Sequence, residues 1–223
     1  MSQARLRPSK NLDYSDGRSF DKFRPMFLRS IVFLSAAATL VSCSPELTPA
    51  DALRIDLSGY CGKAFAGKLV SNDDVDAGFA SEEIIMHVRD CSENEARIPL
   101  HVGDNRSRTW ILSAREDGGV RLKHDHRHED GEPDAITMYG GDMVPTDDAD
   151  WDDGSYAFPA DDFSKTMFDE RGNPDSKQNT WVVELDPKRD HFAYQMSRPN
   201  RFFRIEFDLS EPVEIPSPAW GHE

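Results

Sequence analysis

The clearest chemical pattern in this chain is a run of three alternate histidines. His124, His126 and His128 alternate with charged residues between Arg121 and Glu129. Alternate side chains of an extended strand lie on the same face, so the histidines would share one face and the charges the other. Because charged side chains are costly to remove from water, we expect the histidine face to point into the protein.

Imidazoles on an inward face could bind a transition metal such as zinc. Same-face residues lie about 6.6 Å apart along a strand and the outer two of three about 13 Å apart, whereas a zinc–nitrogen bond is about 2.0–2.1 Å long. Two of the three histidines could therefore share one ion with a ligand from a neighbouring strand, as in a metal-dependent hydrolase. The alternatives are a catalytic histidine or, with no cofactor, a polar row that is hydrogen-bonded internally or faces a ligand.

A hairpin is expected to position this strand. The turn residues Asp117-Gly118-Gly119 separate it from a preceding apolar run that contains Trp110. A three-residue loop with a left-handed glycine keeps all inward residues on one face, whereas a two-residue loop mixes the faces. The pairs predicted by this register are Ala114 with Leu122, Leu112 with His124, Trp110 with His126, and Arg108 with His128.

The pattern elsewhere predicts a mainly β protein. Runs typical of strands occur at 84–89, 109–112, 135–139, 180–185, 191–196 and 202–209, the last with strict alternation of apolar and charged residues. One short helix is expected near 160–171. We therefore predict a single domain over 59–213, an antiparallel β-barrel or sandwich, and a frayed tail over 214–223.

The N-terminal region has the features of a targeting signal. An apolar run over 31–41 follows arginines and ends at Leu40-Val41-Ser42-Cys43. The run is too short to span a bilayer and has the layout of a signal peptide, here 1–42. Residues 1–25 are unusually polar for such a segment, and Met26 could be the true start. The four residues that end at Cys43 resemble the lipobox of bacterial lipoproteins.

That resemblance implies cleavage before Cys43, acylation (including palmitate) of this cysteine, and a lipidated tether over 43–58. It also implies a membrane-anchored protein of the bacterial cell envelope. Ser44 is compatible with passage to the outer membrane, where the domain would face the periplasm. With Cys43 assigned to the lipid, two cysteines remain, Cys61 and Cys91. They form an even pair in an oxidising compartment, where a disulfide is expected. The alternative is two unrelated buried thiols.

The net negative charge of the chain argues against some classes of binding partner. The full chain has a formal net charge of −15. Residues 1–43 hold seven Lys and Arg but three Asp and Glu, so the remaining chain carries −19. Such a surface disfavours nucleic acid and peripheral binding to anionic lipid, which leaves the N-terminal lipid as the contact with the membrane.

The segment from Thr109 to Gly131, with Tyr139-Gly140-Gly141, resembles an uncharacterised family of exported bacterial proteins. The size of the domain also suggests a calycin-like barrel, by analogy of shape. Two functions follow as hypotheses: a non-enzymatic module that binds a small ligand or an envelope protein, or a metalloprotein that uses the histidine strand. The first would have a partly hollow interior lined by residues such as Trp110, His126 and Phe203.

Overall fold

The computed structural model describes residues 46–146 and 149–222, which fall within one compact unit. The predicted signal peptide, the possible extension over 1–25 and the lipid site at Cys43 lie outside these residues. None of the described helices is long and apolar enough to cross a membrane.

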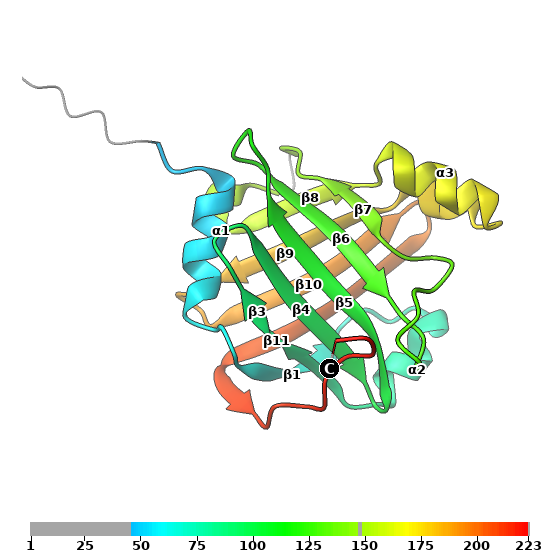
Figure 1. Ribbon diagram of the computed structural model, residues 1–223, viewed down its shortest axis with the longest axis horizontal. Helices are drawn as coiled ribbons and strands as arrows, with labels where there is room; N and C mark the ends of the chain where they lie inside the picture. Colours follow the sequence, from blue (N-terminus) through cyan, green and yellow to red (C-terminus); the bar gives the residue numbers. More distant parts are fainter. Residues whose placement is uncertain (1–45, 147–148, 223) are drawn as a thin grey trace, which may run out of the picture. The chain divides into compact units, whose positions relative to one another are not determined.

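Eleven antiparallel strands and three α-helices make up the described part of the chain (Figure 1). Their order is α1 (Pro49–Ser58), β1 (Ala64–Leu69), α2 (Ala77–Ala80), β2 (Ile84–His87), β3 (Asp90–Cys91), β4 (Glu95–Val102), β5 (Asn105–Ala114), β6 (Val120–His126), β7 (Tyr139–Asp142), β8 (Ser155–Pro159), α3 (Asp162–Glu170), β9 (Thr180–Asp186), β10 (His191–Arg198) and β11 (Arg201–Val213). Short 3₁₀ turns cover Asp74–Asp76, Trp151–Asp153 and Pro174–Gln178.

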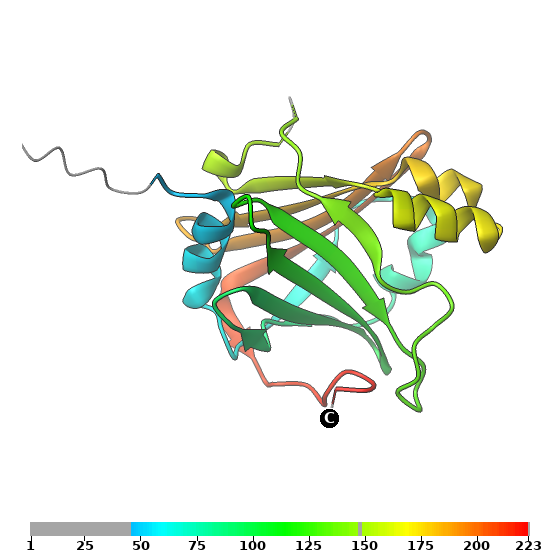
Figure 2. The ribbon, with the colours of Figure 1, turned by 45° about the horizontal axis from the view of Figure 1, so that its top comes forward.

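The strands form one sheet that curls into a nearly closed barrel. Ten strands follow the order β7-β6-β5-β4-β2-β1-β11-β10-β9-β8, and β3 pairs with β4 outside this path. Figure 2 shows the β4–β6 side of the sheet facing the β8–β10 side. The predicted β-barrel architecture is therefore confirmed.

The two ends of the sheet meet between β7 and β8. The amide of Val144 donates to the carbonyl of Ala157 at 3.0 Å, and that of Asp161 donates to the carbonyl of Gly140 at 2.9 Å. A Cβ atom at Gly141 would overlap the carbonyl oxygen of Pro159. Glycine thus lets the two edges approach closely enough to close the barrel.

Alternation along β11 supplies much of the core. Phe203, Ile205, Phe207 and Leu209 are buried, as the sequence pattern predicts. They pack with Phe192 of the neighbouring strand β10 and with Trp110 of β5 on the other side of the barrel. The predicted helix over 160–171 is confirmed as α3.

One end of the barrel is covered by α1 (Figure 1). The helix begins after Thr48, whose hydroxyl accepts a bond from the amide of Asp51, and it buries Leu53 and Leu57 in the core. The prediction that 43–58 is a tether outside the domain is therefore wrong for α1. The apolar spacing of four residues places both leucines on one helical face against the barrel.

The C-terminal segment is not frayed, contrary to the prediction. Ala219 is buried, and the amide of Trp220 donates to the carbonyl of Arg106 at 3.1 Å. His222 lies against β6, where its Nε2 is 2.9 Å from the carboxylate of Asp125. These bonds satisfy groups of both segments, so the short tail is held although it contains no helix or strand.

One predicted strand is also wrong. Residues 135–138 form bends and irregular backbone, and β7 begins only at Tyr139. The carboxylate of Asp134 accepts a bond from the amide of Ile136, and the hydroxyl of Thr137 accepts one from the amide of His126. Side-chain oxygens thus accept bonds from two of the amides that a regular ladder would pair with carbonyls, although the amide of Met138 still donates to the carbonyl of His124 at 2.6 Å.

Candidate functional site

The strand β6 presents the first two histidines to the interior, but not the third. The side chain of His124 is 2% exposed, and His126 is half-buried. β6 ends at His126, and the side chain of His128 is 59% exposed beyond it. The prediction that His128 faces inward is therefore wrong, because the chain leaves the sheet before reaching it.

The hairpin has the predicted loop type at a shifted place. The amide of Gly118 donates to the carbonyl of Arg115, and that of Arg115 donates to the carbonyl of Gly119, which leaves a three-residue loop over 116–118. Gly118 adopts a left-handed φ of 81°. The loop therefore begins one residue earlier than predicted.

The consequence is a register that differs by two residues from the predicted one. The observed pairs are Ala114 with Val120, Leu112 with Leu122, Trp110 with His124, and Arg108 with His126. A shift of two residues keeps every side chain on its face, so the inward pattern of the sequence is satisfied equally well by both registers.

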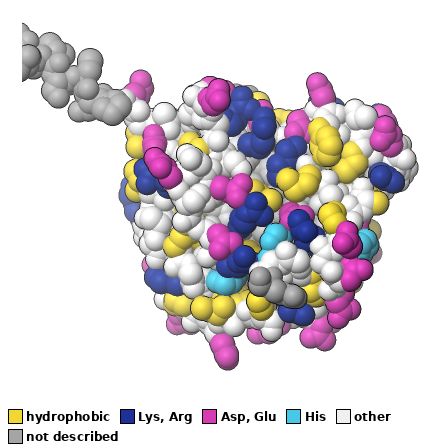
Figure 3. Space-filling view, in the orientation of Figure 1, with side chains coloured by type: hydrophobic (Ala, Val, Ile, Leu, Met, Phe, Trp, Pro, Cys, Tyr) yellow, Lys and Arg dark blue, Asp and Glu magenta, His cyan; other side chains and the backbone are white. Residues whose placement is uncertain are grey.

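The outer face of β6 carries charges, as expected, with one exception. Arg121 pairs with Asp142 at 2.5 Å, and Lys123 pairs with Asp161 at 2.5 Å. Figure 3 shows Lys and Arg side chains interspersed with Asp and Glu on this face of the molecule. Asp125 is the exception, because the C-terminal segment covers it.

His124 is held by two hydrogen bonds. Its Nδ1 lies 3.0 Å from the carbonyl oxygen of Tyr139, and its Nε2 lies 2.7 Å from the hydroxyl of Tyr194. A carbonyl only accepts, so Nδ1 carries the proton and Nε2 accepts from the phenol. Burial lowers the pKa of His124 to about 3, and the imidazole is neutral.

His126 makes a second contact of the same kind. Its Nε2 lies 3.0 Å from the hydroxyl of Tyr139. Burial, with a smaller contribution from the charge of Arg108, lowers the pKa of His126 to about 4. Burial also raises the pKa of Tyr139 to about 12. Both inward histidines and their phenol partners are therefore uncharged at neutral pH.

This arrangement does not assemble a metal centre. Within 46–146 and 149–222, no group of three or more His, Cys, Asp or Glu side chains is placed to hold a metal ion. Both ring nitrogens of His124 already have partners, so a metal would have to displace the bond to Tyr194. The hypothesis of a zinc or other transition-metal site finds no support in this geometry.

The inward histidines instead line a cavity of about 340 Å³. It lies toward the end of the barrel opposite α1, where α2 and the segment after α3 contribute to its wall (Figure 1). Its apolar and aromatic lining consists of Phe79, Leu100, Trp110, Ile136, Tyr139, Phe168, Trp181, Tyr194, Met196 and Phe203. Its volume is within the range of small-molecule sites in proteins.

Aromatic rings form much of the wall. Trp110 stacks on Tyr194 with ring centroids 4.3 Å apart and an interplanar angle of 21°. Tyr139 lies 4.5 Å from the ring of His124 and 5.5 Å from Trp181. Phe168 of α3 packs against Tyr139 at 5.4 Å. These contacts hold the rings in place, so the cavity is largely preformed.

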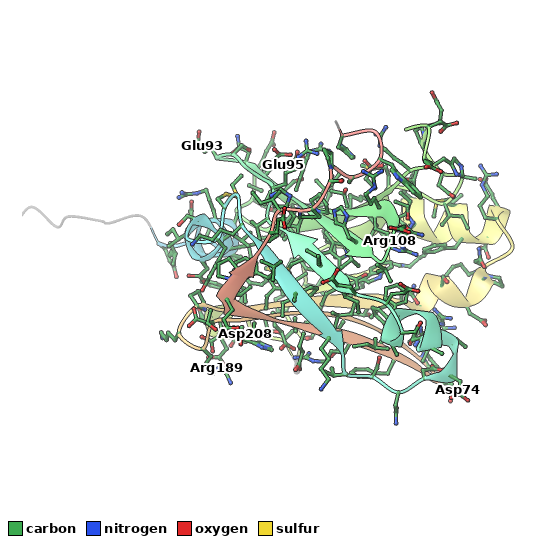
Figure 4. All side chains as sticks on the ribbon, turned by 90° about the horizontal axis from the view of Figure 1, so that it is seen from below. Asp74, Glu93, Glu95, Arg108, Arg189 and Asp208 are labelled. Atoms are coloured by element: carbon green, nitrogen blue, oxygen red, sulfur yellow. A yellow bond between two sulfur atoms is a disulfide. The ribbon has the colours of Figure 1, made fainter. Side chains whose placement is uncertain are left out.

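The charged groups of the cavity are unbalanced. Arg108, Arg198 and Arg201 line it, against one carboxylate, Asp76. Arg201 binds both oxygens of Asp76, at 2.8 and 2.5 Å. Among the described residues, Arg108 and Arg198 have no carboxylate partner. In Figure 4, Arg108 lies among the side chains in the body of the domain, whereas Asp74 lies at its margin.

The predicted site residues are thus partly brought together. Arg108, Trp110, His124 and His126 line the cavity, and so does Phe203. Cys61 and Cys91 are joined by a disulfide, as predicted, with Cα atoms 6.2 Å apart. This bridge lies outside the cavity lining and connects the segment after α1 to β3.

Several cavity residues were not anticipated from the sequence. Tyr139, Trp181, Tyr194 and Arg198 were not among the predicted site residues, although all four line the cavity. These residues come from strands that meet only when the barrel closes. The available signal was the aromatic content of β9 and β10, which does not distinguish a packed core from a cavity wall.

Comparisons with known proteins do not extend this description. Neither the scan against protein-family models nor the searches of curated proteins and solved structures found a match to this chain.

Proposed function

We propose that this chain is a lipid-anchored protein of the bacterial cell envelope whose barrel binds a small molecule without transforming it. The observation that carries the proposal is the cavity of about 340 Å³, with rigid aromatic walls and arginines that lack carboxylate partners. Charged side chains are rarely kept in a partly buried site without a counter-charge. A ligand that supplies the missing partner accounts for both features.

A catalytic role is not part of this proposal. The two inward histidines are the titratable groups best placed for acid–base chemistry, yet burial holds both pKa values well below neutral pH. Each is engaged by a tyrosine. A general base works best with a pKa near the operating pH, and neither ring meets this condition.

The envelope location is supported by the sequence around Cys43, which resembles a lipobox. The first helix begins at Pro49, so only a few residues separate Cys43 from the barrel. We therefore propose a short connection between the lipid and the domain, with the outer membrane as the site of attachment.

Metabolic labelling tests the lipid anchor. Cells that express the full chain are grown with radiolabelled palmitate, beside cells that express Cys43→Ala. Label is expected in the wild-type protein and not in the variant. Absence of label from the wild type, or label that persists in Cys43→Ala, would overturn this part of the proposal.

Ligand binding is tested on the full-length protein in lipid nanodiscs. A panel of anionic, neutral and cationic small molecules is titrated by calorimetry, with empty nanodiscs as the blank. At least one compound is expected to bind with one-to-one stoichiometry. Ser176→Trp should abolish that binding, because Ser176 lines the cavity and a larger side chain would fill it.

The matched control is Ser210→Trp, which adds the same bulk at an exposed position of β11 outside the cavity. It is expected to bind as the wild type does. If no compound of the panel binds, or if both tryptophan variants bind equally well, the cavity is not a ligand site and the proposal fails.

A further inference from the structure

The cavity is electropositive in a strongly negative protein. Its charged lining residues are three arginines and one aspartate, while the chain after residue 43 carries −19. The inward histidines add no charge, because burial keeps them neutral. Anions are therefore attracted to the cavity and repelled by the rest of the surface.

Arg108 is available for an anion. Its Nη1 donates to the side-chain oxygen of Asn105 at 3.1 Å and lies 3.4 Å from the hydroxyl of Ser107, both neutral acceptors. Among the described residues, its Nη2 and Nε have no acceptor. The guanidinium lies 5.4 Å from the ring centroid of Phe79, which holds it in place.

Arg198 has a similar environment on the opposite side of the barrel. Its Nη1 donates to the side-chain oxygen of Asn179 at 3.0 Å, and Asn179 is itself buried. Nη2 of Arg198 has no acceptor within the described part of the chain. Arg201 differs, because both of its Nη atoms are bound to Asp76. Among the described residues, the charged donors of the cavity that lack a carboxylate partner therefore belong to Arg108 and Arg198.

The remaining wall selects for a flat apolar body. The stacked pair of Trp110 and Tyr194 and the rings of Tyr139 and Trp181 present aromatic surfaces to the cavity. Flat rings pack well against such surfaces. Arginine binds a carboxylate through two parallel hydrogen bonds, which suits a planar acid.

We infer that the ligand of this cavity is a small aromatic carboxylate, with its anionic group on Arg108 or Arg198 and its ring among the aromatic walls. This inference rests on the proposed ligand-binding function and names the chemical class. It requires that the negative charge and the aromatic body each contribute to binding.

Two nearly isosteric probes separate charge from shape. 2-Naphthoate and its uncharged amide, 2-naphthamide, are titrated by calorimetry into the full-length protein in nanodiscs. Naphthoate is expected to bind at least tenfold more tightly than naphthamide, because a hydrogen bond to a charged group contributes more than that factor. Equal affinities would overturn the inference and leave the proposed function standing.

Variants assign the charge effect to residues. Arg108→Met and Arg198→Met are each expected to lower the affinity for naphthoate, by at least tenfold in one of the two variants. Neither substitution should change the affinity for naphthamide. Retained naphthamide binding shows that a variant is folded. The control Arg189→Met removes an exposed arginine outside the cavity and should change neither affinity. Naphthoate binding that survives both cavity substitutions would refute the assignment.

A third outcome separates the two proposals. If neither probe binds the wild type, the ligand is not an aromatic carboxylate of this kind and the inference fails. The proposed function would then still stand or fall with the wider panel described above, since that panel includes neutral and cationic compounds.

Discussion

The buried imidazole of His124 should make this protein sensitive to acid. As the pH falls, the unfolded chain takes up a proton at this residue near the ordinary pKa of 6.5, whereas the folded chain does so only near 3. The stability that depends on the neutral ring is therefore fully present above pH 6.5. It is lost progressively as the pH falls towards 3.

The size of the effect follows from these two pKa values. Between pH 7 and pH 4.5, the unfolded chain becomes almost fully protonated at His124 while the folded chain stays neutral. This difference costs on the order of 2–3 kcal/mol of unfolding free energy. Domains are typically stable by about 5–15 kcal/mol, so this loss is a large part of the unfolding free energy.

The perturbation is His124→Gln, which keeps a polar side chain but removes the titrating group. Urea unfolding followed by tryptophan fluorescence measures the stability of both proteins at pH 7 and pH 4.5. The variant is expected to be less stable at pH 7, since it disturbs the bonds to Tyr139 and Tyr194. Its loss between the two pH values should be roughly 2–3 kcal/mol smaller than that of the wild type.

His128→Gln is the matched control, because the side chain of His128 is 59% exposed and its removal leaves the cavity intact. Its loss between the two pH values should equal that of the wild type. Burial also lowers the pKa values of His87, His101 and His126, and these residues contribute equally to all three proteins. If His124→Gln loses as much stability as the wild type, the buried neutral imidazole is not the cause, and the reasoning is refuted.

Three further predictions concern the elements that hold the barrel together. Gly141→Ala should destabilise the protein by at least about 3 kcal/mol in urea unfolding, because its Cβ would overlap a carbonyl of β8. Gly59→Ala, which meets no atom within 4 Å, should change stability by less than about 0.5 kcal/mol. Reduction of the bridge between Cys61 and Cys91, 30 residues apart, should lower the unfolding free energy by about 3–4 kcal/mol, and an unchanged urea midpoint would contradict this. His222→Ala should cost about 1.5–3 kcal/mol, since it removes a bond to the buried aspartate of β6, whereas a frayed tail would give no loss.

The histidine strand illustrates how far the sequence pattern leads. Alternation placed His124 and His126 on the inner face, because a strand has a strict period of two. The same period could not distinguish two registers that differ by two residues, and the structure chose Trp110 rather than Leu112 as the partner of His124. The place of the hairpin loop decided between them, and it depends on which backbone groups close the turn.

The ends of the domain show a different limit. The helix α1 and the segment 214–222 have few strong periodic signals, and both were expected to lie outside the fold. Leu53, Leu57 and Ala219 are nevertheless buried. Short segments gain stability mainly from the surfaces they cover, and those surfaces exist only after the barrel has formed.

By itself, the sequence determined the β class, one of the three described helices (α3), the inward faces of β6 and β11, and the pairing of Cys61 with Cys91. These features depend on local periodicity, charge and cysteine count. Only the tertiary structure decided the register of β5 with β6, the exit of His128 to solvent and the cavity that joins Arg108 to Arg198. The cavity joins strands that are distant in the chain, so its geometry is set by the closure of the whole sheet rather than by any one segment. The register is local to one hairpin, but it depends on which backbone groups close the turn, and the period of two in the sequence does not determine that.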